Sequence, residues 1–142
     1  MFSNAAQYAL RAVSHLGARD HSGFVPVRVI AEELEIPPTF LAKVLKQLVD
    51  TGFLKAYRGP TGGVMLARPT TQITVRQIVE AIDGPELFTE CILGLPGCGD
   101  RLPCPMHEGW SVIRTQLAAD FDRQTIETIS EACRNGSLRL TP

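Results

Sequence analysis

The residues whose types and spacing could do chemistry are gathered in one stretch, CILGLPGCGDRLPCPMH, which runs from Cys91 to His107. Six residues separate Cys91 from Cys98, five separate Cys98 from Cys104, and two separate Cys104 from His107. Glycines and prolines recur throughout the stretch, so it can form neither a continuous helix nor an interior strand. A flexible loop that carries three soft sulfur donors and one imidazole is typical of a metal or cluster site.

The spacing of these four residues leaves several uses open. Structural zinc sites usually pair their ligands in short Cys-x2–4-Cys turns, and here only Cys104 and His107 are that close. Longer loops suit an iron–sulfur cluster better, because its irons spread the ligands over a wider body. The thiols could also form a regulatory disulfide or simply pack. The spacing favours a cluster, and Cys133, on an expected apolar helix face near Ile129, is predicted to be a small buried hydrophobe.

The whole chain has the dimensions of one domain, or of a small domain with an appended element. It lacks an apolar run of about 20 residues that could cross a membrane, and its first residues do not resemble a secretory signal. We therefore expect a cytoplasmic protein with reduced thiols. Residues 1–68 carry eight Lys/Arg and five Asp/Glu (net +3), whereas residues 69–142 carry six and ten (net −4). A basic first half would suit a nucleic acid partner.

The first half of the chain predicts a helix-turn-helix. After a helix over 3–18, a turn over 20–23 and a short extended piece over 24–27, apolar spacing predicts a helix over 27–34, a break over 35–38 and a second helix to about 51. In this geometry the second helix presents its outer face to the major groove. That face carries Thr39, Ala42, Lys43, Lys46 and Gln47. From these helices alone, a helical hairpin inside an enzyme remains an alternative.

A predicted hairpin follows directly, with strands over 53–58 and 64–67 joined by a glycine-rich loop over 59–63. A hairpin after a helix-turn-helix is a wing, and Arg58 and Gly59 stand at its tip. An arginine there suits insertion into a narrow minor groove. The loop lacks the following Lys-Ser/Thr and helix of a phosphate-binding P-loop. The expected fold is therefore mainly α with a small β-wing.

The second half predicts a capped helix over about 75–83, then the cysteine loop, a long helix over about 105–121 and a last helix after Thr125. The long helix carries an apolar stripe that one small domain can scarcely cover, formed by Trp110, Ile113, Leu117 and Phe121. We expect a symmetric homodimer, which would place two recognition helices about 34 Å apart. A lid over the chain's own winged domain is the alternative. The predicted division is a DNA-binding domain over 1–83, a cluster loop over 84–107 and a dimerisation region over 108–142.

Four segments together resemble a known family, the Rrf2 family of bacterial transcription regulators. They are the run YALRA at 8–12, the break IPPTFL at 36–41, the wing RGPTGG at 58–63 and the triple-cysteine loop. The resemblance covers about residues 2–135. It implies a homodimer crossed by the long helix, double-stranded promoter DNA as the partner, and a cluster that modulates DNA affinity. It also implies a regulator and not an enzyme.

The resemblance extends to single residues. Cys91, Cys98 and Cys104 match the family's cluster cysteines, and His107 matches the histidine that completes a [2Fe–2S] site in IscR-type members. Gln7 stands where the nitric-oxide-sensing branch has an aspartate ligand to a [4Fe–4S] cluster. A neutral amide is a poor iron ligand, so [2Fe–2S] is favoured over [4Fe–4S]. The loop also has one residue more between Cys91 and Cys98 than those members usually have.

In the predicted recognition helix, Thr39 and Lys43 fall at positions that the family uses for DNA contact. Ala42 stands where IscR-like members can carry a glutamate, so no operator sequence follows from the resemblance. The predicted DNA-binding set is Thr39, Lys43, Lys46, Gln47, Arg58 and Gly59. The resulting hypothesis is a regulator whose cluster senses redox state, nitric oxide or iron–sulfur status. The alternatives are a cluster-free regulator that uses thiols, zinc or a protein partner, and a small iron–sulfur electron carrier.

Overall fold

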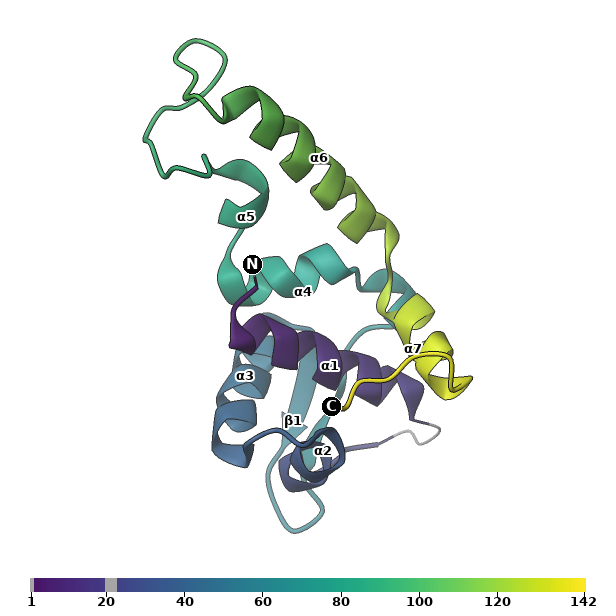
Figure 1. The fold of residues 1–142 in the computed structure, drawn as a ribbon. Helices are drawn as coiled ribbons and strands as arrows, with labels where there is room; N and C mark the ends of the chain where they lie inside the picture. Colours follow the sequence, from purple (N-terminus) through teal and green to yellow (C-terminus); the bar gives the residue numbers. More distant parts are fainter. Residues whose placement is uncertain (1, 20–22) are drawn as a thin grey trace.

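The computed structural model describes residues 2–19 and 23–142, and Figure 1 shows the arrangement of its elements. Apart from Gly23, the turn predicted over 20–23 lies outside the described residues. The order is α1 (Asn4–Ala18), α2 (Val27–Leu34), α3 (Pro38–Asp50), β1 (Leu54–Tyr57), β2 (Gly63–Leu66), η1 (Thr70–Gln72), α4 (Val75–Asp83), α5 (Glu86–Thr89), α6 (His107–Arg123) and α7 (Ile126–Arg134). The mainly helical architecture with a small wing is as predicted.

The helix-turn-helix is confirmed in α2 and α3. α2 ends at Glu35, whose left-handed backbone (φ 55°) turns the chain, and Pro38 begins α3 in the position where a missing N–H costs nothing. The apolar side chains of both helices are buried against α1, and their core is formed by Ile30, Leu34, Leu41, Val44, Leu45 and Leu48. Burial of this one face leaves the other face of α3 exposed.

The wing consists of β1 and β2, which pair antiparallel from Leu54 opposite Leu66 to Tyr57 opposite Gly63. The predicted strands were each slightly misplaced, and the extended piece over 24–27 also joins the wing. Val25 and Val64 exchange backbone hydrogen bonds of 2.8 and 2.9 Å. A Cβ atom on Gly63 would lie 2.1 Å from the Val25 carbonyl oxygen, so this close approach requires glycine.

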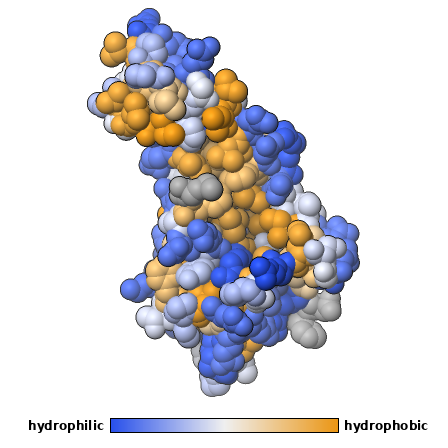
Figure 2. Space-filling model, viewed as in Figure 1, coloured by the Kyte–Doolittle hydropathy of each residue, from blue (hydrophilic) through white to orange (hydrophobic). Residues whose placement is uncertain are grey.

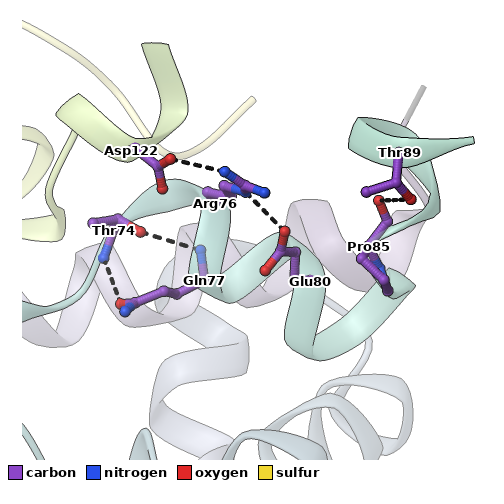
Figure 3. A network of polar contacts seen from close by, with 7 residues as sticks. All are labelled: Thr74, Arg76, Gln77, Glu80, Pro85, Thr89 and Asp122. Carbon is purple, nitrogen blue, oxygen red and sulfur yellow. Dashed lines mark hydrogen bonds and ion pairs between the residues drawn. The ribbon is translucent and has the colours of Figure 1, made fainter. Parts of the chain in front are cut away.

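α4 begins with the predicted capping box: Thr74 accepts from the Gln77 backbone N–H, and the Gln77 side chain accepts from the Thr74 N–H (Figure 3). α4 then packs against α1 and α3. The short helix α5 that follows was not predicted. One turn is too short to show an apolar period, but Phe88 within it is buried against Val75 and Val79.

α6 begins two residues later and ends two residues later than predicted. It runs from the cysteine loop back towards the winged module (Figure 1). Leu117 and Phe121 pack against α4 and α5, so the chain itself covers part of the stripe that was expected to need a partner. Val112 and Ile113 remain 62% and 57% exposed. Figure 2 shows apolar surface in the middle of the molecule, where α4 to α6 lie, and at the end that carries the cysteine loop.

The far end of α6 is joined to the winged module. The Val75 N–H donates to the Gln124 carbonyl at 2.9 Å, and the Ile126 N–H donates to the Ile73 carbonyl at 2.8 Å. α7 then packs along α1, where the buried Ser130 hydroxyl donates to the Ser14 carbonyl at 3.0 Å. Cys133 is partly buried in α7 and its burial raises the pKa of the thiol, which agrees with the predicted packing role. No helix within the described residues is long and apolar enough to cross a membrane.

Candidate metal centre and nucleic-acid interface

The loop between α5 and α6 brings the three predicted thiols together. The Sγ atoms of Cys91, Cys98 and Cys104 all lie within 4.8 Å of one another. The Cys91 and Cys104 sulfurs are 3.5 Å apart, and the Cys104 backbone N–H donates to the Cys98 sulfur at 3.4 Å. Cys104 is buried and the other two are partly buried, whereas most of the residues between them are exposed.

His107 completes the group at the first turn of α6. Its Nδ1 lies 3.5 Å from the Cys98 sulfur, and its Nε2 lies 3.2 Å from an Asp100 carboxylate oxygen. With its proton on Nε2, next to the carboxylate, His107 would present the Nδ1 lone pair to the thiols. Asp100 was not singled out from the sequence. Its position within the same short loop was the available signal.

The surroundings of the thiols shift the pKa values of Cys91 and Cys98 in opposite directions. The backbone N–H of Leu95, helped by that of Leu93 and by the neighbouring thiols, lowers the pKa of Cys91 to about 7. At Cys98 the Cys104 N–H favours the thiolate, but desolvation and the neighbouring thiols outweigh it and raise the pKa. Since metals bind thiolates, Cys91 is more readily supplied in the ligand form than Cys98.

The donor atoms fit a metal group by their chemistry and by their separations. Around one tetrahedral ion with 2.3 Å metal–sulfur bonds, ligand atoms lie about 3.8 Å apart, close to the 3.5 Å between Cys91 and Cys104. Cys98 and His107 form a second pair at the same separation. The exposed glycine-rich segments between the cysteines can adjust to a wider body, such as an iron–sulfur cluster.

Arg76 of α4 links α5 and α6, the helices on either side of the cysteine loop, to the winged module. This junction was not predicted from the sequence. The Arg76 guanidinium contacts Glu80 and, on α6, Asp122, each at 2.8 Å (Figure 3). It also lies over the Phe88 ring of α5, 5.2 Å from the ring centre. These carboxylates raise the pKa of Arg76. No pattern in the sequence reveals this junction, because its members come from three separate segments.

The predicted DNA-contact residues lie on α3 and the wing. The α3 set, Thr39, Lys43, Lys46 and Gln47, is exposed on one helix, opposite its buried leucines. Arg58 and Gly59 are exposed at the end of β1. A groove between α3 and the wing is lined by Lys46, Arg58 and Gly59 among others. Lys46 also pairs with Asp50 at 2.9 Å, and both side chains remain exposed.

Together, the exposed second helix, the adjoining wing and the long helix define a winged helix-turn-helix transcriptional regulator. The family model of Rrf2, described as an iron-dependent transcriptional regulator, matches residues 2–132. The chain belongs to the Rrf2 family, which consists of regulators and not of enzymes.

Relatives agree with this assignment, and solved structures share the fold. A protein of Aquifex aeolicus described as an HTH-type transcriptional regulator is 32% identical over 91% of this chain and 90% of its own length. The IscR regulator of Cronobacter sakazakii is 27% identical over 87% and 76%. The fold is similar to that of CymR, the global cysteine regulator of B. subtilis (TM-score 0.77, 23% identity, 92% and 96% covered), and of T. potens IscR (TM-score 0.76, 20% identity, 98% and 92% covered).

In metal-free protein, mild oxidation with diamide should join Cys91 to Cys104. Their sulfurs at 3.5 Å need to approach by about 1.5 Å to reach bonding distance. The two thiols lose two protons and two electrons to diamide as the S–S bond forms. Cys98 instead faces His107 and the Cys104 N–H. Peptide mapping without reduction measures the pairing, and equal amounts of all three possible pairs would contradict this geometry.

Proposed function

We propose that this protein is a homodimeric transcription regulator whose affinity for promoter DNA is set by an iron–sulfur cluster held by Cys91, Cys98, Cys104 and His107. The observation that carries the proposal is the convergence of three sulfurs within 4.8 Å, with His107 at 3.5 Å from one of them. The four donors come from one loop, and the family's description includes iron dependence. A bound cluster would supply a centre that reacts with oxidants and nitric oxide.

The cluster type that we propose is [2Fe–2S]. The separation of the donors into two pairs supports it, and so does Gln7, which offers an amide where a carboxylate ligand would be needed for a [4Fe–4S] site. The Gln7 side chain is exposed on α1 and donates to the Phe2 carbonyl at 3.3 Å. A reducing cytoplasm, which we expect from the sequence, would keep the three cysteines available as ligands.

The proposed dimer interface is the outer face of α6. Val112 and Ile113 are exposed there. Ser111, Thr115 and Ala119 are small residues one helical turn apart, which allow a second helix to approach closely. A shallow groove on this face is lined by Ser111, Val112, Thr115, Gln116 and Ala119. In the proposed division, residues 1–83 bind DNA, 84–107 hold the cluster and 108–142 form the dimer.

The experiment that tests the proposed function is anaerobic isolation, followed by visible absorption, iron and sulfide analysis, and DNA binding before and after removal of the cluster. We expect a coloured protein with iron and sulfide in equal amounts and a change in DNA affinity when the cluster is lost. A colourless protein with one zinc per chain would instead establish the zinc alternative. Identical DNA affinity in both states would contradict control by the cluster.

Replacing Arg58 with alanine should weaken DNA binding and reduce the slope of log affinity against log salt by about one unit. Arg58 is exposed at the wing, so its loss should remove about one phosphate or minor-groove contact and leave folding unaffected. The measurement is a titration of fluorescent promoter DNA at several salt concentrations. Arg123→Ala, which removes an exposed arginine from the far end of α6, is the matched control. Equal salt slopes in the two variants would exclude the wing from the interface.

A further inference from the structure

The two ends of the cysteine loop are tied together by a contact that the cluster ligands do not make. The indole Nε1–H of Trp110 donates to the Glu90 carbonyl at 2.8 Å, and a guanidinium N–H of Arg114 donates to the same oxygen at 3.1 Å. Glu90 is the residue at which α5 ends and directly precedes Cys91. Two donors from α6 therefore hold one carbonyl on the other side of the loop.

This carbonyl is well placed to control Cys91. The Glu90 carbonyl and the Cys91 nitrogen belong to the same planar peptide unit. Two hydrogen bonds to that oxygen fix the plane, and so they fix the start of the Cys91 residue. A hydrogen bond from an arginine is charge-assisted and stronger than a neutral one. Without them, Cys91 would keep its connection to α5, the contact of its sulfur with Cys104 and its hydrogen bond with the exposed segment that follows.

Trp110 and Arg114 also lie on the same helix as His107, a second proposed ligand. Residues 107, 110 and 114 recur at spacings of three and four, so His107, Trp110 and Arg114 share one side of α6. The imidazole contacts the Cys98 sulfur at 3.5 Å. The same helix therefore presents one ligand directly and positions another through its backbone.

We infer that Trp110 and Arg114 are positioning residues that hold Cys91 in the metal site and couple the occupancy of that site to α6. The inference deepens the proposed function and rests on it. Outer contacts of this kind typically change metal affinity by 10–100-fold. The Trp110 and Arg114 donors do not bind the metal; they act through the Glu90–Cys91 peptide.

The test combines a metal probe with the chain's single tryptophan. Titration of metal-free protein with Co²⁺ is followed by its sulfur-to-cobalt absorption, in the wild type, in Trp110→Phe and Arg114→Gln, and in the double variant. We expect the double variant to bind Co²⁺ at least tenfold more weakly. Arg114→Lys should bind Co²⁺ more tightly than Arg114→Gln, because an ammonium group can still donate to the Glu90 carbonyl. Arg123→Gln, on the same helix and paired with Asp120, should behave as the wild type.

A second measurement does not depend on metal. The indole N–H of Trp110 gives one signal in a nitrogen–proton spectrum, and we expect its exchange with solvent to be slow in the wild type and faster in Arg114→Gln. Circular dichroism checks that each variant is folded. A double variant whose Co²⁺ affinity is within twofold of the wild type would overturn the inference. So would a wild-type Trp110 indole N–H that exchanges as freely as that of an exposed tryptophan. A wild type that binds neither cobalt nor cluster would overturn the proposed function as well.

Discussion

Cys98→Ser should abolish the proposed cluster binding and leave the proposed dimer folded. The Cys98 sulfur accepts the Cys104 N–H at 3.4 Å and lies 3.5 Å from Nδ1 of His107, so it occupies the junction between the two donor pairs. A serine hydroxyl is a hard, weakly acidic donor and cannot replace a thiolate on iron. Anaerobic reconstitution should give less than about a tenth of the wild-type visible absorption and bound iron.

The matched control for this substitution is Cys133→Ser. Cys133 is partly buried in α7 and is separate from the three clustered sulfurs. We expect full cluster content and a small loss of stability of about 1 kcal/mol, from placing a hydroxyl in an apolar environment. If Cys98→Ser retained the wild-type iron content, or Cys133→Ser lost it, the proposed ligand set would be wrong.

Ile113→Asp should convert the proposed dimer to monomers and lower DNA affinity by at least about 100-fold. The Ile113 side chain is 57% exposed in the single chain, so a polar replacement should have little effect on the folding of the protomer. In a symmetric α6 interface each copy would bury an unpaired carboxylate, which costs several kcal/mol. Loss of the second recognition helix then removes half of the DNA contacts.

Light scattering should show a mass near the 15.5 kDa of one chain where the wild type has about twice that mass. Leu138→Asp introduces the same charge at another exposed apolar side chain, which is 60% exposed. Leu138 lies near the C-terminus, outside the proposed interface on α6, so this variant should remain dimeric. An Ile113→Asp protein that stays dimeric would show that a surface other than this part of α6 makes the contact.

Much of the fold was predictable because local signals and tertiary packing agree. The Thr74–Gln77 capping box, the break at Pro38 and the leucine spacing of α3 each set an element boundary within a residue or two. These features act between neighbours along the chain, where spacing alone determines what can meet. The gathering of the three cysteines was also predictable, because one flexible loop carries them all.

The missed features depend on contacts between distant segments. α5 is a single turn whose stability comes from the burial of Phe88, which no local period reveals. The covering of Leu117 and Phe121 by α4 and α5 depends on the angle at which α6 returns, and that angle is set elsewhere. The contact of Trp110 with the Glu90 carbonyl spans the whole loop. Trp110 was instead expected to belong to the partner-facing stripe.

The anchoring of α6 at its far end has a mechanical consequence. The Gln124 and Ile126 backbone bonds fix that end to the winged module, together with the Ser130 hydroxyl of α7, which donates to the Ser14 carbonyl of α1. The other end of α6, at the cysteine loop, makes no backbone hydrogen bond to another helix or strand among the described residues, and its polar ties to the end of α5 run through the Trp110 and Arg114 side chains. In the part of the chain that the structure describes, backbone hydrogen bonds therefore fix α6 to the winged module at one end only. We expect a rearrangement at the thiols to change the angle of α6 to that module rather than to shift the helix along its axis. In a dimer whose two α6 helices cross, such a change of angle would alter the distance between the two wings.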